Sequence, residues 1–166
     1  MASAAIPPAE LPIREGLAPV IGTAPRVLIL GSFPSEKSLD TGQYYANVRN
    51  QFWRLTGTIL GFDPDLTYPQ RTAAITAQGA ALWDVVHSCR RAGSLDSKID
   101  RKSLVFNDFD AFLGSHPTIE RVYVNGLTAF ELFTRQSALA AVRLPSSSGA
   151  LTMSFDEKLA AWRAIA

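Results

Sequence analysis

The stretch RVLILGSFPSEKS, residues 26–38, carries the clearest structural signal in the chain. Its first half is a compact apolar run, a pattern typical of a buried β-strand. Gly31 and Pro34 then predict a tight turn, and the serines around them can hydrogen-bond a phosphate or a base. An ordinary strand-to-loop connection has the same composition. The stretch therefore predicts a buried strand, and the turn after it becomes a candidate site.

Three further segments have the length and composition of strands: 81–86 (ALWDVV), 121–125 (RVYVN) and 142–144 (VRL). Helices are expected between and after them, from apolar residues at helical spacing and from capping residues. They cover 50–60, 69–79, a segment that begins near 107, 127–136, and a last segment that begins with the capping box of Ser154 and Glu157. Strands that alternate with helices predict an α/β fold with three layers, α/β/α, around a short central parallel sheet of about four strands.

Each predicted strand leads into a segment rich in glycine, serine, asparagine or aspartate. These segments are GSFPSEKS, DVVHSC, NGLTA and LPSSSGA. In an open parallel sheet, ligands bind outside the carboxyl ends of the strands, which share one edge. The sequence therefore predicts that four distant segments converge on a single site.

The composition fits one domain that buries a single core, with 166 residues, of which 47% are hydrophobic and 19% charged. We expect a partly irregular N-terminal extension over residues 1–25 and one domain over 26–166. A single cysteine and the lack of a long apolar run favour a cytoplasmic protein without disulfides or membrane spans. The net charge of +1 argues against a strongly basic nucleic-acid coat. We expect a monomer that uses no metal and no cofactor.

Two loops carry residues suited to contacts with nucleic acid. In QYYANVRNQFW, residues 43–53, the ring of Tyr44 or Tyr45 can stack on a base, an interaction worth roughly 1–3 kcal/mol. The alternative is that these rings pack under the loop. In LPSSSGA, residues 144–150, hydroxyl and amide groups can bind phosphate oxygens, and Leu144 can wedge between bases. Without that context, LPSSSGA is a plain surface loop.

Taken in order and with their intervals, these segments resemble the uracil-DNA glycosylase superfamily. GSFP is similar to its first active-site motif, and LPSSSGA to the DNA-intercalating loop of the mismatch-specific uracil- and thymine-DNA glycosylases. QYYANVRNQFW, ALWDVVHSCRRAGSLDSKI, NDF and NGLTAFELF resemble most the hypoxanthine-DNA (DNA-deoxyinosine) glycosylase branch. The resemblance covers roughly Val20 to Ala166. It implies a monofunctional DNA glycosylase of base excision repair that flips a deaminated base out of DNA, with hypoxanthine as the expected base and uracil and xanthine as further ones.

The resemblance also indicates which residue positions the water molecule that attacks the sugar after the glycosidic bond breaks. Many members of the superfamily have an asparagine or aspartate where this chain has Phe33, which can neither aim nor activate water. The hypoxanthine branch is similar to this chain in placing an asparagine before FW, here Asn50. Its carbonyl oxygen can orient water but cannot take a proton, which suffices if the glycosidic bond breaks largely before water attacks. The structural alternative for Asn50 is a cap on the following helix.

Asp84, near the end of the second predicted strand, is the second catalytic candidate, since the resemblance places the base-reading side chain there. An ionised carboxylate only accepts hydrogen bonds. Hypoxanthine and uracil present a ring N–H on the pairing edge, and adenine does not. Two alternatives are a structural carboxylate bonded to backbone amides and a general base that activates water.

The remaining predicted contacts come from the same segments. The base-binding candidates are Gly31, Ser32, Phe33, Tyr44, Tyr45, Trp83 and Asn125. The DNA-binding candidates are Leu144, Pro145, Ser146, Ser147, Ser148 and Gly149. A basic stretch is either a phosphate track or a solvated face: Arg90, Arg91, Lys98, Arg101 and Lys102. The rival functions are a non-catalytic module that binds DNA or a nucleotide, and a hydrolase of free nucleosides.

Overall fold

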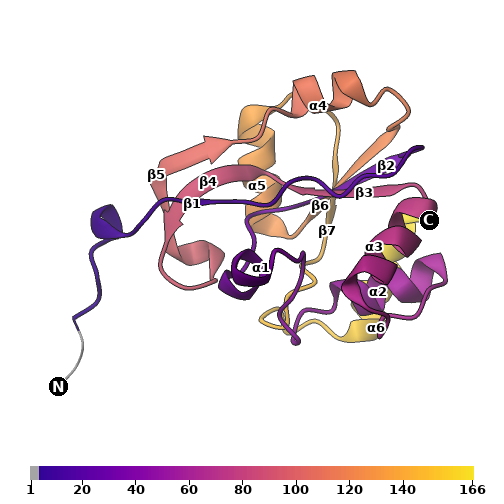
Figure 1. Ribbon diagram of the computed structural model, residues 1–166, viewed down its shortest axis with the longest axis horizontal. Helices are drawn as coiled ribbons and strands as arrows, with labels where there is room; N and C mark the ends of the chain where they lie inside the picture. The colour runs from indigo at the N-terminus through magenta and orange to yellow at the C-terminus, as the bar shows by residue number, and fades with distance from the viewer. Residues whose placement is uncertain (1–3) are drawn as a thin grey trace.

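The computed structural model describes residues 4–166 (Figure 1). Its central sheet has four parallel strands in the order β3-β2-β6-β7. The strands are β2 (Val27–Gly31), β3 (Ala80–Asp84), β6 (Arg121–Asn125) and β7 (Val142–Leu144). All five residues of β2 are buried, as an apolar run without alternation predicts for a strand that is covered on both faces. The predicted parallel sheet of four strands is confirmed.

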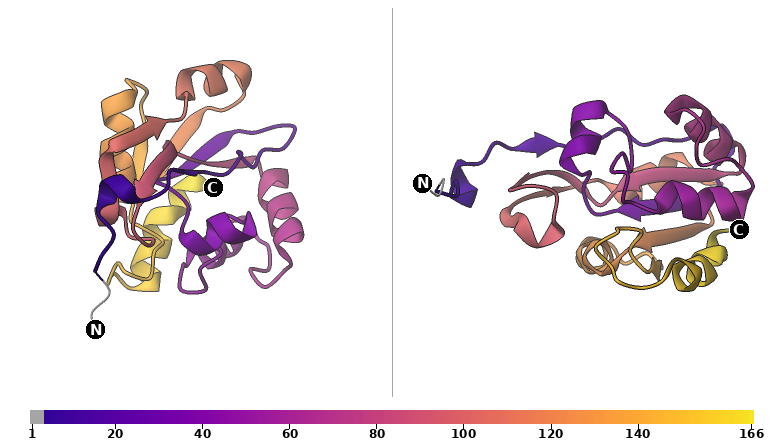
Figure 2. Two further views of the ribbon diagram at one scale, coloured as in Figure 1. Left: turned by 60° about the vertical axis from the view of Figure 1, so that its left-hand side comes forward. Right: turned by 90° about the horizontal axis from the view of Figure 1, so that it is seen from below.

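Helices cover both faces of this sheet (Figures 1 and 2). One face packs against α2 (Phe52–Leu60), α3 (Tyr68–Ala77) and α6 (Phe155–Trp162), and the other against α4 (Phe109–Ser115) and α5 (Leu127–Gln136). Because side chains alternate along a strand, Val27 and Ile29 join the first core, whereas Leu28 and Leu30 join the second. The three-layer α/β/α architecture is confirmed.

The other helical elements are short. The helix α1 (Glu36–Thr41) follows the turn after β2, and single 3-10 turns lie at η1 (Pro8–Glu10), η2 (Asp96–Lys98) and η3 (Arg163–Ile165). Two helix starts have the caps that the sequence predicts. Asp108 accepts the backbone N–H of Ala111 at the start of α4, and Ser154 forms the expected capping box with Glu157 at the start of α6.

The sequence does not predict the second sheet. It is antiparallel, with the order β1-β4-β5, and consists of β1 (Arg14–Glu15), β4 (Val86–Arg91) and β5 (Ile99–Phe106). The strand expected over 81–86 therefore ends at Asp84, and the chain passes through Val85 into β4. Polar and charged residues are frequent in these strands, so no apolar run marks them.

The segment before β2 contacts the domain at several points. Besides the pairing of β1 with β4, Val20 forms an isolated antiparallel bridge with Leu82, and Leu17 packs against the first core. The division between an extension over 1–25 and a domain over 26–166 stays a prediction, and its first three residues lie outside the described part. Over residues 4–166, every helix is too short or too polar to cross a bilayer.

Candidate functional site

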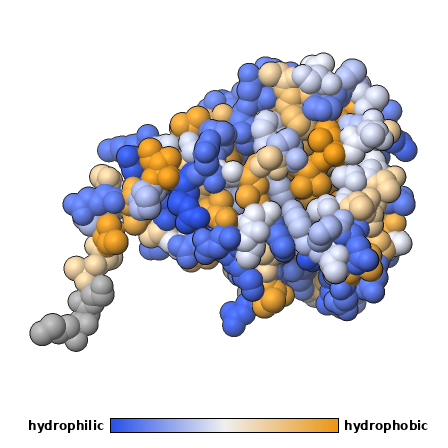
Figure 3. Space-filling view, viewed as in Figure 1, coloured by the Kyte–Doolittle hydropathy of each residue, from blue (hydrophilic) through white to orange (hydrophobic). Residues whose placement is uncertain are grey.

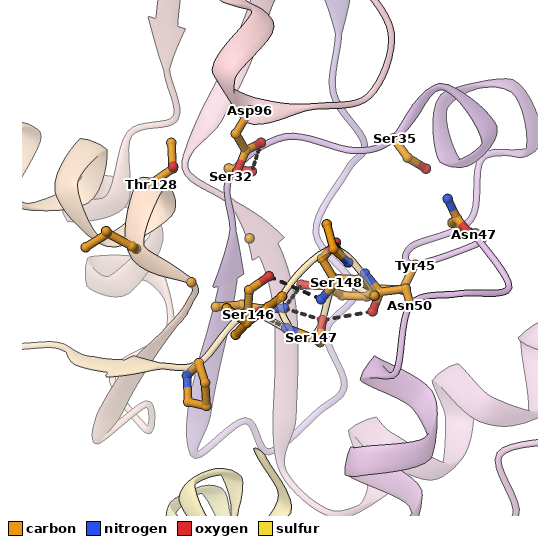
Figure 4. Close-up of a pocket in the computed structure, with 18 of the residues that line it drawn as sticks. Ser32, Ser35, Tyr45, Asn47, Asn50, Asp96, Thr128, Ser146, Ser147 and Ser148 are labelled. Carbon is orange, nitrogen blue, oxygen red and sulfur yellow. Dashed lines mark hydrogen bonds between the residues drawn. The ribbon is translucent and has the colours of Figure 1, made fainter. Parts of the chain in front are cut away.

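The carboxyl ends of the parallel strands open onto one cleft of about 1180 Å³ (Figure 4). Its walls come from the turn after β2, the loop before α2, the β4–β5 connection, the β6–α5 junction and the loop after β7. All predicted site residues except Trp83 line it: Gly31, Ser32, Phe33, Tyr44, Tyr45, Asn50, Asp84, Asn125 and residues 144–149. The predicted convergence of distant segments therefore agrees with the structure.

A chain of hydrogen bonds joins three of these walls (Figure 4). Asn125, at the end of β6, donates from Nδ2 to Ser147 Oγ at 2.8 Å and accepts the Ser147 backbone N–H at 2.9 Å. The Ser147 hydroxyl in turn donates to Asn50 Oδ1 at 2.8 Å, and that oxygen also accepts the backbone N–H of Phe52 at 2.9 Å. Segments up to 97 positions apart are thereby fixed in one arrangement.

The partners of Asn50 determine which way its amide group faces. The Phe52 backbone N–H can only donate, so the atom beside it is the carbonyl oxygen. That oxygen has two lone pairs, and Phe52 and Ser147 occupy both. Among the described residues Nδ2 has no partner. Gln51 is the N-cap residue of α2, and Asn50 before it accepts the N–H of the first helical residue, Phe52. Asn50 also offers an N–H₂ group to the cleft, rather than the free carbonyl oxygen that the sequence suggested.

Asp84 lies at the floor of the cleft and is only 4% exposed. Its Oδ2 is buried and receives no hydrogen bond from the described part of the chain. Burial, and after it the negative charge of Asp96, raise the pKa of Asp84 to about 7, while Arg91 opposes the shift. The carboxyl group therefore changes charge near neutral pH. An orphaned oxygen of this kind is suited to a ligand that brings its own hydrogen-bonding group.

Gly31 explains how this carboxyl group reaches the cleft. It is the residue opposite Asp84 in the pairing of β2 with β3. A Cβ atom at position 31 would lie 2.5 Å from Asp84 Oδ1 and 3.1 Å from the hydroxyl of Tyr45. The first distance is far inside van der Waals contact, so a larger residue would displace the carboxyl group.

The two adjacent tyrosines take different positions. Tyr44 is 3% exposed and donates its hydroxyl hydrogen to the backbone oxygen of Ala18 at 2.9 Å, so it packs under the loop. Tyr45 has a φ of +54°, the only positive φ outside glycine in residues 4–166, and its ring stacks on Phe52 at 3.9 Å between centroids. A left-handed backbone at such a residue costs about 1–3 kcal/mol and persists only where the surroundings impose it. Tyr45 is thus the tyrosine whose polar group is held at the cleft wall, 3.3 Å from Asn125 Nδ2.

Asp96 is a further cleft residue, and it was not among the residues predicted from the sequence. It lies in η2, on the β4–β5 connection, and accepts the hydroxyl hydrogen of Ser32 at 2.7 Å. Burial raises the pKa of Asp96. Close by, the guanidinium of Arg91 donates to the backbone oxygen of Pro34 and lies 5.0 Å from the ring centre of Phe33. These contacts hold the turn after β2 in place.

Two predicted roles do not match the structure. Trp83 packs against Phe109 and Phe112 in the second core, away from the cleft, so it is not placed to touch a base there. Leu144 is 2% exposed and belongs to the first core, so it cannot wedge between bases. Other apolar side chains are exposed at the cleft instead: Leu127, Leu151 and Met153.

The predicted basic stretch does not form one track. Arg91 is buried and donates to the backbone oxygen of Pro34 in the turn after β2, and Arg90 donates to the backbone oxygen of Leu11, so both side chains bind the protein itself. The exposed members are Lys98, Arg101 and Lys102, which do not line the cleft. Across residues 4–166, no three histidine, cysteine, aspartate or glutamate side chains are grouped as a metal site requires.

Comparison with known proteins gives a consistent result. The model of the uracil DNA glycosylase superfamily matches residues 19–166. A hypoxanthine DNA glycosylase of Methanosarcina acetivorans is 34% identical over 156 residues, which is 92% of this chain and 98% of that protein. A hypoxanthine DNA glycosylase of Methanosarcina barkeri is 34% identical over 152 residues, 90% of this chain and 95% of that protein. The solution structure of a candidate uracil DNA glycosylase from M. acetivorans superimposes with a TM-score of 0.78 at 34% identity, covering 92% of this chain and 96% of that one.

Proposed function

Since the chain belongs to the uracil DNA glycosylase superfamily and is a DNA glycosylase, we propose that the base it removes is hypoxanthine, with uracil and xanthine as slower substrates. Two relatives that cover nearly the whole chain are named for hypoxanthine. The observation that carries the proposal is the buried carboxyl group of Asp84 at the floor of the cleft, with one oxygen left without a partner. A flipped base that brings a ring N–H to this oxygen completes its hydrogen bonding.

Asp84 distinguishes bases by what their pairing edges offer. In its ionised form the carboxylate accepts the ring N–H of hypoxanthine, whereas adenine presents a bare ring nitrogen that repels it. Flipping costs a few kcal/mol and is cheapest for a mispaired nucleotide, which adds selectivity for damaged sites. The enzyme therefore discriminates hypoxanthine from adenine in two ways: by the hydrogen-bonding groups on the pairing edge of the flipped base, and by the weaker base pair that a deaminated base forms in DNA.

Asn50 holds the attacking water. Its Nδ2 group can donate to the oxygen of a water molecule and leave a lone pair of that oxygen free for attack. A donor cannot take the proton of water, so this arrangement works when the glycosidic bond breaks largely before water attacks and positioning dominates catalysis. The hydrogen bonds from Ser147 and Phe52 fix the direction in which Nδ2 faces.

The loop 145–149 binds the DNA backbone beside the flipped nucleotide. The hydroxyl groups of Ser146 and Ser148 are partly exposed at the cleft and are donors for phosphate oxygens. Ser147 is buried and its hydroxyl and N–H groups bond Asn50 and Asn125 instead. Gly149 lets this loop lie against the segment before α2, because a Cβ there would come within 2.8 Å of the Arg49 backbone oxygen. The contact keeps the phosphate-binding loop and Asn50 at a fixed separation.

We also propose that the protein acts as a monomer in the cytoplasm and is monofunctional. On the face shown in Figure 3, hydrophobic residues form small groups among hydrophilic ones, in keeping with a monomer. Lys37, the exposed lysine nearest to the turn after β2 in sequence, does not line the cleft, in keeping with hydrolysis without a lyase step.

A panel of oligonucleotides, each with one deoxyinosine, deoxyuridine, deoxyxanthosine or deoxyadenosine, tests the proposed substrate. We expect abasic product fastest from deoxyinosine and none from deoxyadenosine, with strand breakage only after alkali. Release of uracil without release of hypoxanthine would refute the proposed substrate. Cleavage of free inosine but not of the oligonucleotide would instead indicate a nucleoside hydrolase.

Replacing Gly31 by alanine tests the floor of the cleft. The added Cβ atom displaces the Asp84 carboxyl group, so we expect kcat on the deoxyinosine oligonucleotide to fall about tenfold, as small misplacements of reacting groups do. Gly114→Ala is the matched control, since a Cβ there meets nothing within 4 Å. Wild-type rates in Gly31→Ala, with a native circular dichroism spectrum, would show that the position of Asp84 does not matter.

A further inference from the structure

Lys158 of α6 is a lysine in an unusual place. It is 1% exposed, and its ammonium group donates to Gln51 Oε1 at 2.9 Å and to the backbone oxygen of Ser148 at 3.0 Å. In residues 4–166 the ion pairs join Arg14 to Asp40 and His87 to Glu15, so no carboxylate neutralises Lys158. A buried cation whose partners are all uncharged needs an explanation.

Stability does not provide that explanation. A buried charge without a counter-ion loses its hydration and gains back only part of that free energy from neutral acceptors. Burial accordingly lowers the pKa of Lys158. An unbranched apolar side chain of similar length would fill the same space without this cost.

The partners of Lys158 lie next to the residues that the glycosylase reaction uses. Gln51 follows Asn50 in the chain, and Ser148 follows Ser147, which donates to Asn50 Oδ1. A backbone hydrogen bond from Gln51 to the Ser147 oxygen, at 2.8 Å, runs between the same two segments. The ammonium group of Lys158 is therefore a bridge from α6 to both sides of the contact that orients Asn50.

We propose that Lys158 is a positioning residue that locks the segment 50–51 to the loop 147–148, and so holds the Asn50 amide group and the phosphate-binding loop as one rigid unit. The proposal rests on the function proposed above for Asn50. Lysine suits this role because its three N–H donors radiate from one atom and can reach acceptors on two separate segments.

The variant Lys158→Met keeps the length and removes the donors. We expect kcat on the deoxyinosine oligonucleotide to fall about fivefold, with KM changed by less than about twofold and Tm unchanged or raised. Lys37→Met, at an exposed lysine outside the cleft, is the charge-matched control and should retain wild-type kcat. A lower Tm with unchanged kcat would reduce Lys158 to a structural residue and overturn the proposal.

The double variant with Asn50→Ala separates this proposal from the function on which it rests. If Lys158 acts through Asn50, Lys158→Met causes no further loss of kcat in the Asn50→Ala background, whereas a full additional fivefold loss overturns the link. Should Lys158→Met fail to fold, Gln51→Met removes one of the same hydrogen bonds from the other side and should lower kcat in the same direction. A wild-type protein that releases no hypoxanthine contradicts the proposed substrate, and uracil release then serves as the readout for Lys158.

Discussion

Replacing Asn50 by alanine is expected to lower the rate of hypoxanthine release at saturating DNA by about a hundredfold, or about 2.7 kcal/mol of activation free energy. The variant loses the Nδ2 donor that faces the cleft, and it also loses the acceptor of the Phe52 N–H, which costs about 1 kcal/mol of stability. Single-turnover cleavage of a deoxyinosine oligonucleotide measures the first effect, and thermal unfolding measures the second.

Asn50→Asp is the control that separates these two losses. A carboxylate still accepts the N–H of Phe52 and the hydroxyl of Ser147, so both hydrogen bonds remain, but it has no N–H to donate. We expect near-native stability and a rate as low as that of Asn50→Ala. A rate near the wild-type level in Asn50→Asp would assign the catalytic role to the oxygen and contradict the amide orientation proposed here.

The sequence predicts the central sheet and the position of the site because both depend on local patterns. The apolar run of β2 and the polar segments after β6 and β7 can each be recognised within a few residues. Parallel pairing then brings their carboxyl ends to one edge. This is why Asp84 and Ser147, which are distant in the chain, could be assigned to one cleft. Asn50 follows no strand, and only the family resemblance assigned it to the same site.

The second sheet could not be predicted from the sequence, and neither could the position of Asp96 at the cleft. Both depend on pairing between distant polar segments. The strand β4 pairs with β1 and β5 through backbone hydrogen bonds that leave no periodic apolar signal. Asp96 reaches the cleft only because the β4–β5 hairpin folds over the turn after β2. Two hints are present in the sequence: the Gly-Ser turn before Asp96 in GSLDS, and the resemblance of the longer segment ALWDVVHSCRRAGSLDSKI to the hypoxanthine branch.

The amide orientation of Asn50 and the burial of Leu144 could not be predicted from a sequence pattern either. The first depends on which donors surround the amide: Phe52 is two residues from Asn50, but Ser147 is 97 positions away in the chain. The second depends on the register of β7, whose outer residues are exposed while Leu144 at its end turns into the core. Residue type and spacing suggest a polar loop in both cases, but they do not give its contacts.

Asp84→Asn is expected to make the protein more stable and less active, with both effects largest above neutral pH. The pKa of Asp84 is about 7 in the folded protein and 3.8 in an unfolded chain, so the folded state binds the proton more tightly. Well below pH 3.8 both states are protonated, and Asp84 contributes its full share of the free energy of unfolding. As pH rises from 3.8 through 7 that contribution is lost, which amounts to about 4 kcal/mol. Asparagine stays neutral, so its advantage in unfolding free energy should grow between pH 5 and pH 8.

The activity of the same variant should move in the opposite direction. Wild-type release of hypoxanthine should rise as pH passes through about 7, because the carboxylate that forms there accepts the ring N–H. Asp84→Asn lacks that charge, so we expect its rate not to rise with pH in this range. At pH 8 we expect a rate about 10- to 100-fold below wild type, which corresponds to the free energy of one hydrogen bond to a charged group. An unchanged pH profile, or an unchanged ranking of hypoxanthine, uracil and xanthine, would show that Asp84 does not read the base. A base-reading role explains why the Asp84 carboxyl group is buried at a cost in stability and why its Oδ2 has no partner within the described residues. Without that role, neither feature has an explanation.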